Sequence, residues 1–188
     1  MNKQRVDTVY INMFLDFNRQ TVKQIMGLCT DIVGQHNPEK LYFMLSSNGG
    51  EVVAGFTLYN FLVGLSTKVV MHNVGTVDSI ATVVFLAGDE RYASEHSTFL
   101  YHGVSFTVQG SMSFTLDQLE ERVSSLKEDQ ERIAKIIADK TGLSLDQTKK
   151  YQRRGETLNP EKAKEAKIIS QIREVTIPAN VPLVNIVT

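Results

Sequence analysis

Three segments of the sequence carry residue types that could perform chemistry together. The pair Gly49-Gly50 lies between an apolar run and an expected helix, where glycine lets backbone N–H groups approach a ligand beside the positive helix end. Such a turn suits an oxyanion hole or another anion site. Ser79 stands at an expected strand-to-helix turn, and His102 ends another apolar run. A hydroxyl nucleophile, an imidazole base and N–H donors form the set that acyl transfer requires.

Each of these residues also has a purely structural interpretation. The glycine pair could form only a tight turn, and Ser79 could cap a helix, a role for which Asp78 competes. The serine also lacks the Gly-x-Ser-x-Gly pattern of a nucleophile elbow. A single histidine is more often structural than catalytic, although none of the other three has a setting comparable to that of His102. The hypothesis therefore depends on the three segments meeting in space.

The elements that must position these residues alternate between strand-like and helical patterns, which predicts an α/β fold. Continuous apolar runs suit strands that are covered on both faces of a parallel sheet. Residues 73–79 are expected to form a turn, and the following stretch 80–87 is either a buried helix or another strand, with its small residues favouring the helix. Strands are expected at 8–12, 41–45, 68–71, 91–93 and 98–101, and helices at 19–34, 51–65 and 115–140, with short helices starting near Ser144 and Asn159.

Composition excludes several classes of protein. The 188 residues are 42% hydrophobic and 22% charged, which is typical of one compact domain rather than a disordered chain. A formal net charge of −1 gives no overall attraction to nucleic acid or to an anionic membrane. The single cysteine, Cys29, excludes an internal disulfide framework and a multi-cysteine zinc site. No apolar run approaches the length of a membrane span, so the expectation is a soluble cytoplasmic protein.

The candidate segments resemble those of the proteolytic subunits of the Clp protease (ClpP), serine peptidases with a crotonase-like fold. The family's Asn-Ser-Pro-Gly-Gly segment is similar to Ser46-Ser-Asn-Gly-Gly50, and its Ala-Ala-Ser-Met-Gly segment is similar to Val77-Asp-Ser-Ile-Ala81. The run from Ala87-Gly88 to His102 resembles the family's approach to its catalytic histidine, and Thr141-Gly-Leu-Ser-Leu-Asp-Gln147 resembles a Thr-Gly-x-Ser-Leu-Glu-Gln segment. The resemblance covers roughly residues 8–170 and rests on the order and spacing of the segments.

The resemblance implies a role for each residue of the candidate site. Ser79 would be the nucleophile and His102 the general base, while the backbone N–H groups of Gly50 and Ile80 would form the oxyanion hole. The implied activity is that of a serine-type endopeptidase, which cleaves peptides or unfolded proteins through an acyl-enzyme. Neither a cofactor nor a metal is expected.

The chain departs from the family pattern at three positions. The family's proline is Asn48, and the glycine after the nucleophile region is Ala81. The family's catalytic aspartate aligns with Gly155, which has no side chain to orient an imidazole. The adjacent Glu156 could reach in as its replacement or remain a solvated residue of a charged turn. A non-catalytic or weakened ring subunit is therefore one alternative, and a crotonase-type acyl-CoA enzyme is a second.

The resemblance also implies how the chain is organised. Residues 1–188 would form a single domain, with stacked βαβ units in a head at about 8–110 and 141–175, a handle helix at about 111–140 and an extended tail at 176–188. The apolar stripe of the 115–140 helix predicts a homo-oligomer, and the family's handle stacks two rings. About seven residues precede the first strand, where the family has a longer pore-lining segment, so a Clp-type ATPase partner is left open.

Overall fold

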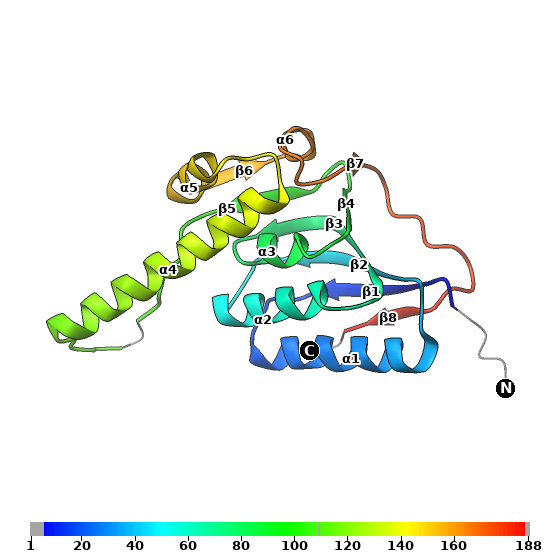
Figure 1. Cartoon of the computed structure of the whole chain (residues 1–188), viewed down its shortest axis with the longest axis horizontal. Helices are drawn as coiled ribbons and strands as arrows, with labels where there is room; N and C mark the ends of the chain where they lie inside the picture. Colours follow the sequence, from blue (N-terminus) through cyan, green and yellow to red (C-terminus); the bar gives the residue numbers. More distant parts are fainter. Residues whose placement is uncertain (1–5, 109, 187–188) are drawn as a thin grey trace.

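The computed structural model describes residues 6–108 and 110–186, which form an eight-stranded sheet with helices packed on it (Figure 1). The strands are β1 (Thr8–Phe14), β2 (Lys40–Ser47), β3 (Lys68–Asp78), β4 (Glu90–Ala93), β5 (Thr98–Tyr101), β6 (Glu156–Leu158), β7 (Gln171–Ile172) and β8 (Leu183–Asn185). The helices are α1 (Arg19–His36), α2 (Val52–Val63), α3 (Ala81–Phe85), α4 (Leu116–Lys140), α5 (Leu145–Arg154) and α6 (Pro160–Glu165). The strand order is β6-β5-β3-β2-β1-β8, with β4 beside β3 and β7 beside β4, and among the described strands only the β5–β6 pair is antiparallel.

The two faces of the sheet are buried in different ways. Successive strand residues point to opposite faces, so Ile11 and Phe43 join the main core with Ile25 of α1 and with residues of α2 and α3. On the other face, Tyr10 and Tyr42 form a second cluster with Met44, Val70 and Tyr92, packed against Val175 and Val181 of the C-terminal segment. The predicted α/β class is therefore correct, and the helices cover the main-core face.

The longest strand, β3, corrects the sequence-based prediction. A strand was expected only over 68–71, with a turn at 73–79, but β3 continues to Asp78. Its first half pairs with β4, and its second half, Thr76–Asp78, pairs with Thr98–Leu100 of β5. The local sequence around Gly75 signals a turn, and the arrival of β5 as a second partner keeps the backbone extended instead.

The helix α4 projects away from the body of the molecule (Figure 1). It begins at a capping box, in which Thr115 and Gln118 exchange side-chain to backbone hydrogen bonds. Only Ile133, Ala134 and Ile137, in its C-terminal half, are buried, and the predicted helix at 115–140 is confirmed. The strand β6, which follows α5 and pairs with β5, was not expected from the sequence.

Two features are absent from the described residues, 6–108 and 110–186. They contain no group of three or more His, Cys, Asp or Glu side chains that could hold a metal ion. No helix within them is long and apolar enough to cross a membrane.

Candidate functional site

Ser79 sits at the sharp turn between β3 and α3. Its φ of 57° is left-handed, a conformation that costs a non-glycine residue about 1–2 kcal/mol and that must be held by its surroundings. The Ser79 N–H donates to the carbonyl of Leu100 at 2.9 Å, and the Ser79 carbonyl accepts the hydroxyl of Thr82 at 2.7 Å. The helix α3 has no side-chain cap, so the Ser79 hydroxyl is not used as an N-cap. Within the described residues the Ser79 hydroxyl makes no hydrogen bond, to His102 or to any other group, and Ser79 lines the cavity described below.

The glycine pair lies directly against this turn. Gly49 has a φ of 106° and Gly50 a φ of 131°, a region that side-chain-bearing residues rarely adopt. A Cβ atom on Gly49 would lie 2.7 Å from the Cβ of Ser79, and one on Gly50 would overlap the carbonyl oxygen of Phe17. Both positions require glycine because the backbone passes too close to its neighbours for a side chain.

The direction of the Gly50 N–H follows from its neighbours in the chain. Phe17 donates its N–H to the Gly49 carbonyl and accepts the Glu51 N–H, both at 2.7 Å, which is the pattern of a parallel bridge. The Gly50 N–H therefore points away from Phe17. Among the described residues neither this N–H nor that of Ile80 has a hydrogen-bond acceptor, a condition that an oxyanion hole requires.

His102 follows β5 directly. Its Nδ1 lies 2.8 Å from the carbonyl oxygen of Gly103. Because a carbonyl can only accept, Nδ1 must carry the proton, and in the neutral ring Nε2 is then the free acceptor. The backbone thus fixes the tautomer that a general base needs.

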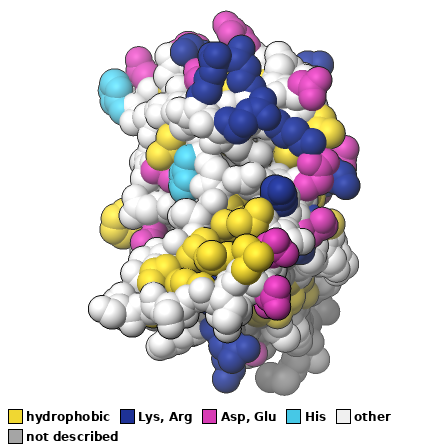
Figure 2. All heavy atoms as spheres, turned by 90° about the vertical axis from the view of Figure 1, so that its left-hand side faces the viewer, with side chains coloured by type: hydrophobic (Ala, Val, Ile, Leu, Met, Phe, Trp, Pro, Cys, Tyr) yellow, Lys and Arg dark blue, Asp and Glu magenta, His cyan; other side chains and the backbone are white. Residues whose placement is uncertain are grey.

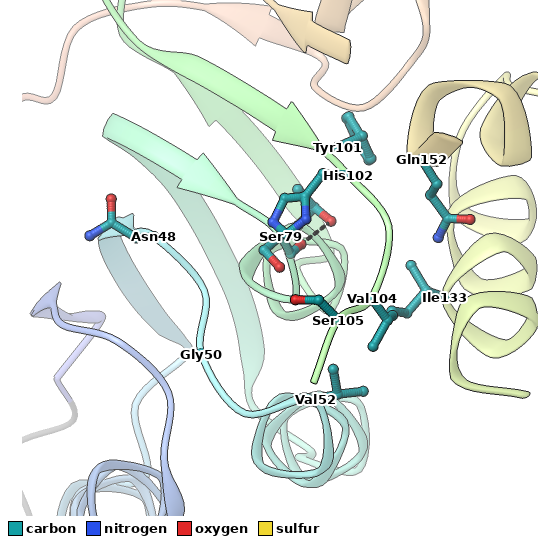
Figure 3. A pocket seen from close by; sticks show the side chains of 11 residues that line it. Asn48, Gly50, Val52, Ser79, Tyr101, His102, Val104, Ser105, Ile133 and Gln152 are labelled. Carbon is teal, nitrogen blue, oxygen red and sulfur yellow. Dashed lines mark hydrogen bonds between the residues drawn. The ribbon is translucent and has the colours of Figure 1, made fainter. Parts of the chain in front are cut away.

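A cavity of about 240 Å³ brings Gly50, Ser79 and His102 together (Figure 3). Neither Ile80, which follows Ser79 in the chain, nor Glu156 is among the residues that line the cavity. The lining residues are Asn48, Gly50, Val52, Ser79, Thr82, Tyr101, His102, Val104, Ser105, Ile133 and Gln152. The sequence contained no signal for Gln152, which belongs to a polar helix and reaches the cavity only because α5 packs on α4.

The position expected to hold the family's aspartate is structurally constrained. Gly155 caps the C-terminus of α5 with a φ of 71°, and its N–H donates to the carbonyl of Tyr151 at 3.0 Å. Glu156 lies in β6 opposite Tyr101, the residue before His102. Across residues 6–108 and 110–186 no carboxylate is hydrogen-bonded to His102, so the role expected of Glu156 stays a prediction.

The largest histidine pKa shift lies away from this cavity. His72 is fully buried in β3, with Nδ1 2.7 Å from the hydroxyl of Tyr42 and Nε2 3.3 Å from that of Ser94. Burial lowers the pKa of His72 to about 4, so the ring is neutral at physiological pH. Because both ring nitrogens are hydrogen-bonded inside the protein, we interpret His72 as a structural histidine.

Comparison with known proteins identifies relatives that match most of the chain. Residues 5–176 match the family model described as Clp protease. The ATP-dependent Clp protease proteolytic subunit 2 of Pseudomonas aeruginosa is 27% identical over 153 residues, which cover 78% of this chain and 74% of that protein. Among solved structures, a mutant of ClpP1 from Listeria monocytogenes is similar in fold, with a TM-score of 0.79 and 21% identity over 88% of this chain and 91% of the other.

Proposed function

Because the chain belongs to the Clp protease family, we propose that it is a serine endopeptidase that forms its acyl-enzyme on Ser79. The observation that carries the proposal is the convergence of Gly50, Ser79 and His102 on one cavity. These residues come from three separate segments of the chain. Peptides or unfolded proteins are the substrates that we propose.

The chemistry follows from the groups that meet in the cavity. The Ser79 hydroxyl attacks a peptide carbonyl, and Nε2 of His102 takes the hydroxyl proton. The N–H groups of Gly50 and Ile80 bind the negative charge that develops on the carbonyl oxygen. His102 then returns the proton to the leaving amine as the C–N bond breaks, and water hydrolyses the acyl-enzyme by the same route.

The Gly103 carbonyl performs part of the role that the aspartate has in a complete Ser-His-Asp triad. At 2.8 Å from Nδ1 of His102 it fixes the tautomer and orients the ring. A neutral carbonyl stabilises the imidazolium less than a carboxylate would, since it carries only a dipole. We therefore propose a Ser–His dyad with a backbone acceptor, and a turnover lower than a complete triad would give.

A second candidate function has one observation in its favour. The acid position is a glycine that the helix α5 needs for its C-cap, which is compatible with a weakened or non-catalytic ring subunit. No comparable observation favours the acyl-CoA enzyme that was considered from the sequence. A cytoplasmic location and an ATPase partner stay predictions.

We also propose that the protein acts as a homo-oligomer. Apolar side chains are exposed along α4 and the segment before it, and an apolar patch crosses the face turned to the viewer in Figure 2. Large contiguous apolar surfaces mark interaction sites. Rings stacked through α4 would cover these side chains, which are Phe106, Val108, Met112, Leu116, Leu119 and Val123.

Labelling with a fluorophosphonate tests the active-peptidase proposal. The assembled wild-type protein should be labelled on Ser79, and the Ser79→Ala variant should not be labelled. The His102→Ala variant should react much more slowly, because the hydroxyl loses its base. An assembled wild type that remains unlabelled would favour the non-catalytic ring subunit.

A further inference from the structure

Gln152 is a buried polar side chain in the wall of the catalytic cavity. It is 5% exposed and lies on the inward side of α5, a helix that is otherwise rich in charged residues. In Figure 3 its amide projects from α5 towards Ile133 and Val104. A buried amide needs hydrogen-bond partners, because leaving its donors and acceptor unpaired is unfavourable.

The partners of this amide are incomplete. Nε2 of Gln152 donates to the carbonyl of Gln130 at 3.5 Å, at the upper limit of a hydrogen bond. Its Oε1 accepts no hydrogen bond from the described residues, 6–108 and 110–186. The second N–H of Nε2 and the unpaired Oε1 therefore remain available to a ligand that reaches this side chain.

The rest of the wall indicates what that occupant is. Val52, Val104 and Ile133 supply aliphatic surface, which suits the stem of an extended side chain. His102 is the only lining residue of the described chain that carries an ionisable imidazole, carboxylate or amine, so a charged occupant would find no fixed counter-charge in the wall. A neutral side chain with an aliphatic stem and an amide end fits both the aliphatic wall and the Gln152 amide.

We propose that Gln152 selects substrates with glutamine at the residue that supplies the scissile carbonyl, P1. A primary amide pairs with the Gln152 amide by donating to Oε1 and accepting from Nε2. This inference rests on the proposed peptidase function, since the cavity must first bind a substrate. It differs from that proposal because it names the side chain that the site prefers.

Fluorogenic peptides that differ only at P1 measure this preference. With assembled wild-type protein we expect kcat/KM for P1 glutamine to exceed that for P1 leucine by about tenfold, since leucine leaves the amide unpaired. Gln152→Met keeps the length of the side chain and should abolish or reverse the ratio. Lys150→Met makes a similar change at an exposed position of α5 and should leave the ratio unchanged.

Two results would overturn the inference: a wild-type preference for leucine over glutamine, or an unchanged ratio in Gln152→Met. A preference for P1 glutamate would also overturn it and would implicate the Lys127 and Arg153 side chains that lie beyond Gln152.

Binding to Ser79→Ala separates this inference from the proposed function, because it needs no turnover. Titration with peptides ending in glutamine or leucine should show about tenfold tighter binding of the glutamine peptide. Equal affinities would reject the role of Gln152 even in a labelled, active enzyme. The expected preference in a protein that fluorophosphonate does not label would support Gln152 and reject the peptidase.

Discussion

The main-chain N–H of Asn48 donates a hydrogen bond of 2.9 Å to a carboxylate oxygen of Asp16. The resemblance noted from the sequence aligns Asn48 with a proline, a residue without an N–H. The Asn48 N–H gains an acceptor from the loop after β1, beside the Phe17 contacts that orient Gly50. A hydrogen bond therefore restrains the turn that a proline ring would restrain covalently.

A double-mutant cycle tests this relationship. Asp16→Ala should lower kcat about fivefold with little change in KM, because a looser turn misplaces the Gly50 N–H by an amount worth about 1 kcal/mol. In an Asn48→Pro background the same Asp16→Ala change should have no effect, since the N–H is gone. Equal losses in both backgrounds would mean that Asp16 acts through some other contact.

The glycine pair should tolerate no side chain. Gly50→Ala places a methyl group against the Phe17 backbone at a φ of 131°, so we expect a loss of more than about 2 kcal/mol in the free energy of unfolding. Urea unfolding measures this. Gly34→Ala is the matched control, because a Cβ on Gly34 meets nothing within 4 Å, and it should be neutral or slightly stabilising.

A Ser–His dyad and a triad completed by Glu156 predict different effects of replacing Glu156. If the Gly103 carbonyl orients His102, Glu156→Gln should leave kcat within about twofold of the wild type. If Glu156 is the acid, the loss should approach the roughly 10⁴-fold that removing the aspartate causes in serine proteases. The imidazole 15N spectrum gives an independent check, and it should report a proton on Nδ1 of His102 in both proteins.

Acid should destabilise the fold through His72. Its pKa is lowered by burial to about 4, against an ordinary value of about 6.5, so the unfolded chain binds a proton in this interval and the folded chain does not. Stability is therefore retained above pH 6.5 and is lost as the pH falls towards 4. Between pH 7 and pH 4.5 this one group should remove about 2 kcal/mol of the free energy of unfolding.

Urea unfolding of His72→Gln isolates this contribution. The glutamine can still pair with Tyr42 and Ser94 but does not titrate, so the stability of the variant should fall by about 2 kcal/mol less than that of the wild type over the same interval. Parallel pH dependences for the two proteins would show that His72 is not the responsible group.

Charges on the exposed stripe of α4 should dissociate the assembly. Leu116 is 69% exposed and Val123 is 47% exposed, and replacing both with glutamate would place unpaired charges in the proposed contact. Light scattering should then report smaller species. Ser125→Glu puts a charge on another face of the same helix and should leave the assembly intact. A wild type that is already monomeric would reject the oligomer outright.

Local sequence patterns were sufficient to predict several helices and strands and the candidate residues of the site. The helical spacing before Lys140 and the apolar run before Ser46 needed only local sequence, because helix and strand periodicities are set by near neighbours. The glycine pair, Ser79 and His102 were also identified locally, as residue types at the ends of strands.

The tertiary structure decided what those residues meet. Local sequence indicated a turn near Gly75, yet pairing with β5 extends β3 to Asp78 and moves the sharp turn to Ser79. The outward direction of the Gly50 N–H depends on Phe17, and the cavity gains Gln152 from a helix that its sequence marks only as polar. Such contacts join segments far apart in the chain, so they are set by strand register and helix packing rather than by neighbouring residues.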